Sequence, residues 1–198
     1  MLLRKAGHPA RSAVCLEEVV RNCKPAQLAE YRTALRVSYI QSDQAQPYLE
    51  LANKELDELR AASAQDSSRS AKLELQLLNI SQGLISLQQL DEAEQLLDEL
   101  IGRFESRSEG DAWMVWSAKS LLGKLAIERG QFEEAKTLLE KCLAKLQSIE
   151  QPKKPIVQSR FATIDRLIIV SDKLQDEESV ARWQKERASA SESQKEKK

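Results

Sequence analysis

The sequence has few of the residues on which most active sites depend. It contains one histidine, three cysteines and six glycines among 198 residues. A catalytic triad would have to use His8 as its base, because no other histidine is present. One histidine and three scattered cysteines also do not supply the ligands of a structural zinc site. Cys15, Cys23 and Cys142 form no C-x-x-C pair, and no glycine-rich loop precedes a lysine that could hold a phosphate. We therefore predict a protein that is not an enzyme and that binds no cofactor and no metal.

Long apolar runs and an excess of one charge are also missing. No stretch of about 18 apolar residues is present, so no membrane span is predicted. The N-terminal segment has no unbroken apolar core of signal-peptide length before Glu17. The formal net charge of −1 provides no field that would attract nucleic acid or an anionic membrane. The unpaired cysteines favour a reducing compartment, and we expect a cytoplasmic protein.

Helix-forming residues, by contrast, are abundant. Aromatic residues make up 5% of the chain, whereas Leu, Ala, Glu, Lys and Gln are frequent. A hydrophobic content of 41% is enough for a packed core. This composition predicts an all-α fold.

The clearest pattern lies in residues 120–146. Apolar residues recur at helical spacing on both sides of Gly130, which can end a helix in the left-handed conformation. Gly123 and Ala135 are small residues that would let the two helices approach closely. Cys142 lies on the apolar face of the second helix and is predicted to be a small core residue. The pattern predicts an antiparallel helical hairpin.

Weaker copies of this hairpin flank it. Ala93 lies 42 residues before Ala135 (135 minus 93), and Val180 lies 45 residues after it (180 minus 135). The stretch 25–60 matches least, because its turn has no glycine and arginines occupy positions expected to be small or apolar. There Asp43 is predicted to cap the second helix. The predicted hairpins cover residues 25–60, 71–105, 112–149 and 158–187.

The two ends of the chain are predicted to lie outside this domain of residues 25–187. Residues 1–24 would form a loose segment with a short helix around residues 13–22. Residues 188–198, which are rich in Ser, Ala, Glu and Lys, would be a disordered tail.

The order of a small residue, a glycine turn, an aromatic and an alanine resembles the tetratricopeptide repeat (TPR). Residues 112–187 resemble, more specifically, the C-terminal repeat segment of planctomycete-type bacterial serine/threonine kinases, with SLLG, a proline-containing link and an A-x-W ending in that order. The kinase motifs G-x-G-x-x-G, H-R-D and D-F-G are absent. The resemblance implies antiparallel hairpins stacked as a short TPR-like solenoid, and an accessory role in holding a partner.

Such a fold predicts a protein–protein interaction scaffold that binds a peptide or protein on its concave face. The repeat template places seven polar residues on the inner faces of successive first helices: Gln82, Ser86, Ser120, Lys124, Glu128, Asp165 and Lys173. The asparagines that a repeat needs to clamp a chain-terminal carboxylate are missing beside Lys119 and Lys124, so no chaperone-tail clamp is predicted.

The three tryptophans leave alternatives open. In the first, Trp116 and Trp183 fill gaps between repeats and Trp113 is a surface anchor for a partner. In the second, all three are exposed anchors for a partner. In the last, Trp113, Trp116 and the exposed end helices bury against a second copy in a self-assembling homo-oligomer. A further hypothesis for the function, based on the resemblance, is a detached regulatory arm of a serine/threonine kinase system.

Overall fold

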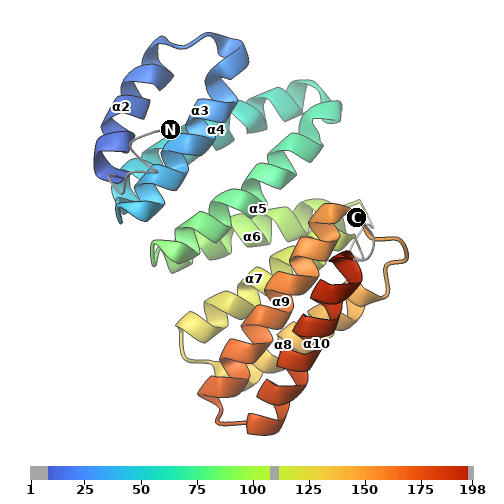
Figure 1. The fold of residues 1–198 in the computed structure, drawn as a ribbon. Coiled ribbons are helices and arrows are strands. Elements are labelled where there is room, and N and C mark those ends of the chain that lie inside the picture. Colours follow the sequence, from blue (N-terminus) through green and yellow to red (C-terminus); the bar gives the residue numbers. More distant parts are fainter. Residues whose placement is uncertain (1–8, 108–111, 196–198) are drawn as a thin grey trace. The chain divides into compact units, whose positions relative to one another are not determined.

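The computed structural model describes residues 9–107 and 112–195. Within these ranges all regular structure is helical (Figure 1), so the predicted all-α fold is confirmed. None of the described helices has both the length and the apolar character needed to cross a bilayer. The chain divides into two compact units, Met1–Leu96 (unit 1) and Leu97–Lys198 (unit 2).

The helices follow one another in pairs joined by short turns. In unit 1, α2 (Pro9–Asn22) precedes the pair α3 (Pro25–Gln41) and α4 (Ala45–Gln65). The short 3-10 helix η1 (Ser67–Arg69) leads into the pair α5 (Ser70–Ser86) and α6 (Leu90–Glu105), and the unit boundary falls inside α6. Unit 2 continues with the pairs α7 (Trp113–Glu128) and α8 (Phe132–Gln147), and α9 (Lys154–Lys173) and α10 (Glu177–Lys195).

Each pair is closed by the same backbone turn. One residue adopts the left-handed conformation, and the next amide donates a 2.9 Å hydrogen bond to the carbonyl five positions earlier. The left-handed residues are Asp43, Gln88, Gly130 and Gln175, with φ of 53°, 58°, 79° and 56°. They recur at intervals of 45, 42 and 45 residues (88 minus 43, 130 minus 88, 175 minus 130). The backbone is therefore periodic even where the side chains are not.

The pair α3/α4 closes in this way without a glycine. Asp43 is the left-handed residue of the turn, and the residue before α4 is Gln44, whose side chain makes no capping hydrogen bond. The prediction that Asp43 caps the second helix is wrong. A short polar side chain tolerates the left-handed conformation better than most, which explains why the turn forms here.

Unit 1 packs α4 against α5 through Tyr48. Its side chain is 1% exposed, and its hydroxyl donates a 3.1 Å hydrogen bond to the carbonyl of Ile80. A Cβ atom on Gly83 would lie 2.0 Å from that hydroxyl oxygen. Because both partners are enclosed, only glycine at position 83 allows this approach.

Two apolar clusters in the described part of unit 2 both include buried residues of α8. One contains Ala135, Leu139, Leu143, Ile164, Leu167, Val170 and Trp183. The other contains Trp116, Cys142, Leu146 and Ile156. A Cβ atom on Gly123 would lie 2.8 Å from the Leu139 side chain, so glycine permits close contact of α7 with α8. Trp116 and Trp183 thus fill gaps between helices, as the first alternative predicts.

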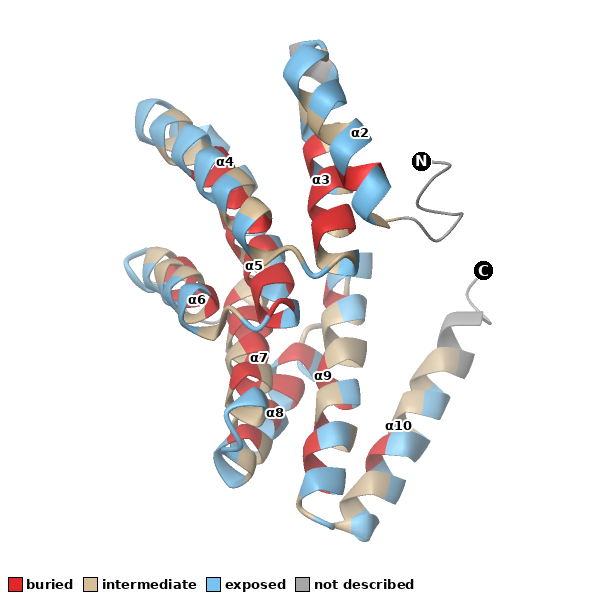
Figure 2. Ribbon diagram, turned by 90° about the vertical axis from the view of Figure 1, so that its left-hand side faces the viewer, coloured by how far each residue is buried: buried red, intermediate tan, exposed pale blue. Residues whose placement is uncertain are grey.

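The first helices of the pairs α5/α6 and α7/α8 are more buried than α10, the second helix of the last pair. Figure 2 shows many buried residues along α5 and α7, whereas α10 is mostly exposed or intermediate. Among the α10 side chains whose burial is described, residues 177–191, Trp183 is the large one in the core. The first helices of these pairs therefore supply more of the core than the last helix does.

Both ends are more helical than their composition predicts. Helix α2 starts at Pro9, and it contacts α3 through hydrogen bonds from Tyr39 to Glu17 (2.8 Å) and from Ser38 to Ser12 (3.3 Å). Helix α10 continues to Lys195, whereas disorder is predicted from residue 188. Alanine, glutamate and lysine are good helix formers, and a helix already begun extends more easily than a new one starts. Residues 1–8 and 196–198 lie outside the described residues.

The turns yield a stability test. Gln175→Gly is expected to raise the free energy of unfolding by roughly 0.5 kcal/mol, because glycine adopts the left-handed conformation without a side-chain penalty. Gln184→Gly, the same exchange inside α10, should lower it by about 1 kcal/mol. Urea denaturation of the two variants measures both values. A loss of stability in Gln175→Gly as large as in Gln184→Gly would contradict the left-handed turn.

Candidate functional site

The described residues offer little for catalysis. Among residues 9–107 and 112–195, no three His, Cys, Asp or Glu side chains are grouped to hold a metal ion. His8 lies outside the described residues. Cys15 is exposed and Cys23 is half-buried, whereas Cys142 is fully buried. Burial raises the pKa of the Cys142 thiol to about 12, so it stays protonated in the core.

Two of the predicted partner-binding residues lie on α5 in unit 1. Gln82 and Ser86 are both exposed and one helical turn apart. The Ser86 hydroxyl donates a 3.1 Å hydrogen bond to the carbonyl of Gln82. The side chain of Gln82 therefore remains accessible from solvent.

Ser120 has a different position from the one predicted. It is fully buried, shares a 2.8 Å hydrogen bond with Thr163 and accepts a 2.7 Å hydrogen bond from Nη1 of Arg166. One turn earlier, the Ser117 hydroxyl donates to Ser159 at 2.7 Å. Hydroxyl groups thus join α7 to α9, and Ser120 positions other groups instead of meeting a partner itself.

The other predicted residues of unit 2 lie close to solvent on α7 and α9. Lys124 is half-buried, while Glu128 and Lys173 are exposed. Asp165 is also exposed, but it accepts a 2.7 Å hydrogen bond from Nε of Arg187 on α10. Lys124 and Lys173 are therefore the better candidates for contact with a partner, and the exposed Glu128, which has an interaction of its own, lies on the same face.

Arg166 is a residue of this region that the repeat template does not identify. Its guanidinium is largely withdrawn from solvent between α7 and α9, and burial lowers its pKa to about 10. Lys124 lies near enough that its own pKa is lowered, first by burial and then by the charge of Arg166. In the described chain, neither cation forms an ion pair with a carboxylate.

Ile169 adds an apolar group to the same surface. It is 49% exposed on α9, and it lies six residues before the left-handed Gln175, as Lys124 lies six residues before Gly130. The two residues are therefore equivalent in the repeat. We define the inner face of unit 2 by Lys124, Glu128, Arg166, Ile169 and Lys173.

Trp113 is only partly available to a partner. It is half-buried at the start of α7 and packs against the cluster that contains Trp116 and Ile156. The ring of Trp116 is itself flanked by the ammonium groups of Lys119 and Lys145, at 5.1 and 5.4 Å from its centroid. Trp113 therefore contributes to packing as well as to the surface.

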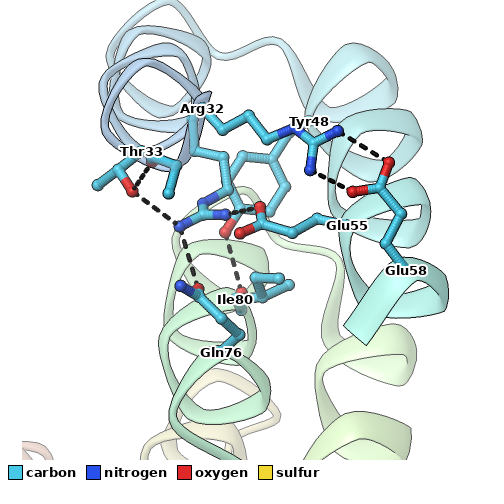
Figure 3. A network of polar contacts seen from close by, with 9 residues as sticks. Arg32, Thr33, Tyr48, Glu55, Glu58, Gln76 and Ile80 are labelled. Carbon is cyan, nitrogen blue, oxygen red and sulfur yellow. Dashed lines mark hydrogen bonds and ion pairs between the residues drawn. The ribbon is translucent and has the colours of Figure 1, made fainter. Parts of the chain in front are cut away.

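The arginines of α3 form a polar network that is internal to unit 1 (Figure 3). Arg32 donates two hydrogen bonds to Glu58, of 2.5 and 2.9 Å. This contact raises the pKa of Arg32 and lowers the pKa of Glu58. The bidentate geometry is the one that best neutralises a guanidinium.

Arg36 is held by a second set of partners in the same network. It pairs with Glu55, donates to Gln76 at 3.1 Å and approaches Thr33 at 3.4 Å. Arg36 and Glu55 are both buried. A buried charge must be compensated, and here the compensation comes from α4 and α5 within the unit. The network therefore holds unit 1 together and presents no free charge.

A surface hollow of about 480 Å³ lies beside the turn of the last pair. Its lining includes Asp172, Asp176, Glu177 and Val180. Asp176 also accepts hydrogen bonds from Lys136 (2.6 Å) and from the Ser179 amide (3.0 Å), which fixes the start of α10. The lining includes none of the residues of the inner face of unit 2.

The sequence matches no protein-family model and no curated protein. The fold is similar to that of BtubC (BKLC) from P. vanneervenii, with a TM-score of 0.63 and 18% identity over 98% of this chain and 77% of that chain. Two crystal structures of a Podosopora anserina protein described as a kinesin light chain with nearly identical TPR-like repeats are also similar. Their TM-scores are 0.60 and 0.56 at 17% identity, over 98% and 96% of this chain and 92% and 90% of those chains.

These similarities define the class of fold. The chain is an all-α, TPR-like helical-repeat protein, which confirms the predicted repeat class. They do not support a particular relationship to the repeat segment of bacterial kinases.

The network in Figure 3 leads to a prediction about unit 1. Glu55→Gln should lower the free energy of unfolding by about 3 kcal/mol, because it leaves the buried Arg36 uncompensated. Glu58→Gln should cost less, about 1 kcal/mol, because Glu58 is itself half-exposed although Arg32 is buried. The double variant Arg36→Met, Glu55→Leu should recover much of the loss. Chemical denaturation followed by circular dichroism measures all three, and equal costs for the two single variants would contradict the assignment.

The start of α10 gives a pH-dependent prediction. Hydrogen bonds from Lys136 and Ser179 hold the pKa of Asp176 well below its usual value. A depressed carboxyl pKa contributes stability above the unfolded-state pKa of about 3.9, and this stability is lost as the pH falls towards the folded-state value. The destabilisation by Asp176→Asn should therefore be largest above about pH 5 and shrink steadily below about pH 4.

The measurement is thermal unfolding of the wild type and of Asp176→Asn at a series of pH values on both sides of the pKa of a free aspartate. Asp172→Asn is the matched control, because this exposed carboxylate in the same hollow has no hydrogen-bond partner in the described residues. A pH-independent difference between wild type and Asp176→Asn would rule out the ionised cap.

Proposed function

We propose that this chain is a non-catalytic interaction module that binds a peptide or protein partner on the inner face of unit 2. The observation that carries the proposal is the combination of an exposed apolar residue, Ile169, with charged groups on two adjoining helices. Interaction surfaces typically combine an apolar contact with polar groups that fix orientation. The unpaired thiols favour action in the reducing cytoplasm.

The architecture supports this proposal. Paired helices place the first helices of successive pairs side by side, and here hydrogen bonds between hydroxyl groups join α7 to α9. A surface held this way is preformed, so little conformational entropy is lost when a partner binds. TPR-like repeats commonly serve as protein-interaction scaffolds, and Gln82 and Ser86 offer comparable exposed positions on α5.

Site-specific photo-crosslinking tests the proposal. The full chain, carrying p-benzoylphenylalanine in place of Lys173 or of Glu128, is irradiated in an extract of the cells that produce it. We expect a discrete adduct with one partner protein from both positions. The matched control replaces Lys141, which is exposed on α8. Equal adduct from position 141, or none from positions 128 and 173, would refute the assigned face.

Self-assembly is the alternative, and it has less support. The oligomer hypothesis needs Trp113 and Trp116 at a surface, but Trp116 is buried within unit 2 and Trp113 is half-buried. Light scattering separates the two functions: a monomer across micromolar concentrations fits the module, and a stable dimer fits self-assembly. A role as regulatory arm of a kinase system rests on the sequence resemblance alone, and a kinase gene beside this one would support it.

A further inference from the structure

Two cations on the inner face of unit 2, Arg166 and Lys124, lie close together without a direct acidic contact in the described residues. Arg166 uses one donor, Nη1, on the buried Ser120 hydroxyl. Lys124 lies on the neighbouring helix, one turn beyond Ser120, within electrostatic reach of Arg166. In the described chain, no ion pair joins either cation to a carboxylate.

The surrounding charges do not remove this imbalance. Asp165, beside Arg166 in sequence, attracts it, but the Asp165 carboxylate accepts its hydrogen bond from Arg187 on α10. Glu128 attracts Lys124 from one turn away, but it has an interaction of its own. Cys142 faces Arg166 from α8 as a neutral thiol. Two like charges therefore remain close together in a partly desolvated place.

This arrangement differs from that of several other partly buried cations in the described chain, among which Arg160 donates to backbone carbonyls of residues 146–149. Arg32 and Arg36 in unit 1 each have a glutamate of α4 as partner. Lys136 in unit 2 likewise has Asp176. Partly buried cations are normally compensated, and an uncompensated pair marks a place where a ligand supplies the negative charge.

We propose that Lys124 and Arg166 bind a side-chain carboxylate of an acidic segment in the protein partner. The inference rests on the function proposed above and names the chemistry of the partner. Ser120 holds one edge of the guanidinium, which leaves the remaining donors to meet a carboxylate in forked geometry. Ile169, at the equivalent place on α9, would contact an apolar residue of the same segment.

A carboxylate bound between the two cations would lower the electrostatic energy of placing them close together. Its negative charge offsets the repulsion between Lys124 and Arg166, and the low local polarity strengthens both new contacts. Removing one cation should consequently weaken binding without weakening the fold. That combination separates a binding role from a structural one.

The test is an NMR titration of the ¹⁵N-labelled full chain with a terminally blocked hexaglutamate peptide. We expect saturable shifts at the side-chain Nε of Arg166 and at the amides around Lys124, and no such shifts with hexaglutamine. Lys124→Gln and Arg166→Gln should each weaken the interaction about tenfold. Lys185→Gln, which removes the same charge from the exposed side of α10, should leave it unchanged.

Three outcomes would overturn the inference. One is equal weakening by Lys124→Gln and Lys185→Gln, which would indicate unspecific attraction. Another is competition by inorganic phosphate at concentrations similar to those of the peptide, which would indicate a site for free anions. The third is a marked drop in melting temperature for Lys124→Gln, because the binding role predicts unchanged or raised stability.

Failure of this inference can be distinguished from failure of the proposed function. A partner that crosslinks to position 173 and binds Lys124→Gln as tightly as wild type would refute the acidic contact alone. Hexaglutamate binding at Arg166 without any crosslinked partner would refute the interaction module and leave the carboxylate site.

Discussion

The closing turn of each helix pair is the constraint on which the rest of the structure depends. A left-handed residue reverses the chain, and a hydrogen bond from the following amide to the carbonyl five residues earlier fixes where the second helix starts. The residue five positions after the left-handed one then lies in the first turn of the second helix. Tyr48 and Ala135 occupy this place in their pairs, and both are buried.

The same register accommodates different packing. Seven residues before the turn stands Gly123 in α7, where it admits Leu139, whereas the equivalent residue of α3 is Arg36. The place of Leu139 in that first pair is taken by the smaller Ala52. Large and small side chains are thus exchanged between the facing helices. The arginine that results is compensated by Glu55 and Gln76, so a repeat can diverge in sequence while its backbone stays the same.

Much of this fold could be predicted from local patterns. Apolar residues at helical spacing indicate the helices, and the places where that spacing is interrupted indicate the turns. The left-handed conformation of Asp43, Gln88 and Gln175 could not be predicted, because the usual glycine is absent and the closing backbone hydrogen bond leaves no trace in composition. The partners of Arg32 and Arg36 could not either, because they lie 26 and 19 residues away in sequence, on another helix. Ser120 was expected at the surface, but α9 covers it, and that contact also brings Arg166 beside Lys124.

Amide hydrogen exchange of the full chain, resolved by NMR, tests the repeated turn most directly. The amides of Gln44, Gln89, Gln131 and Asp176 lie between helices, yet each donates a 2.9 Å hydrogen bond in the closing turn. All four should exchange well below the rates of an unstructured chain. If Gln131 alone were protected, and Gln44 and Asp176 exchanged at unstructured rates, then only the glycine turn would close and the shared register would be contradicted.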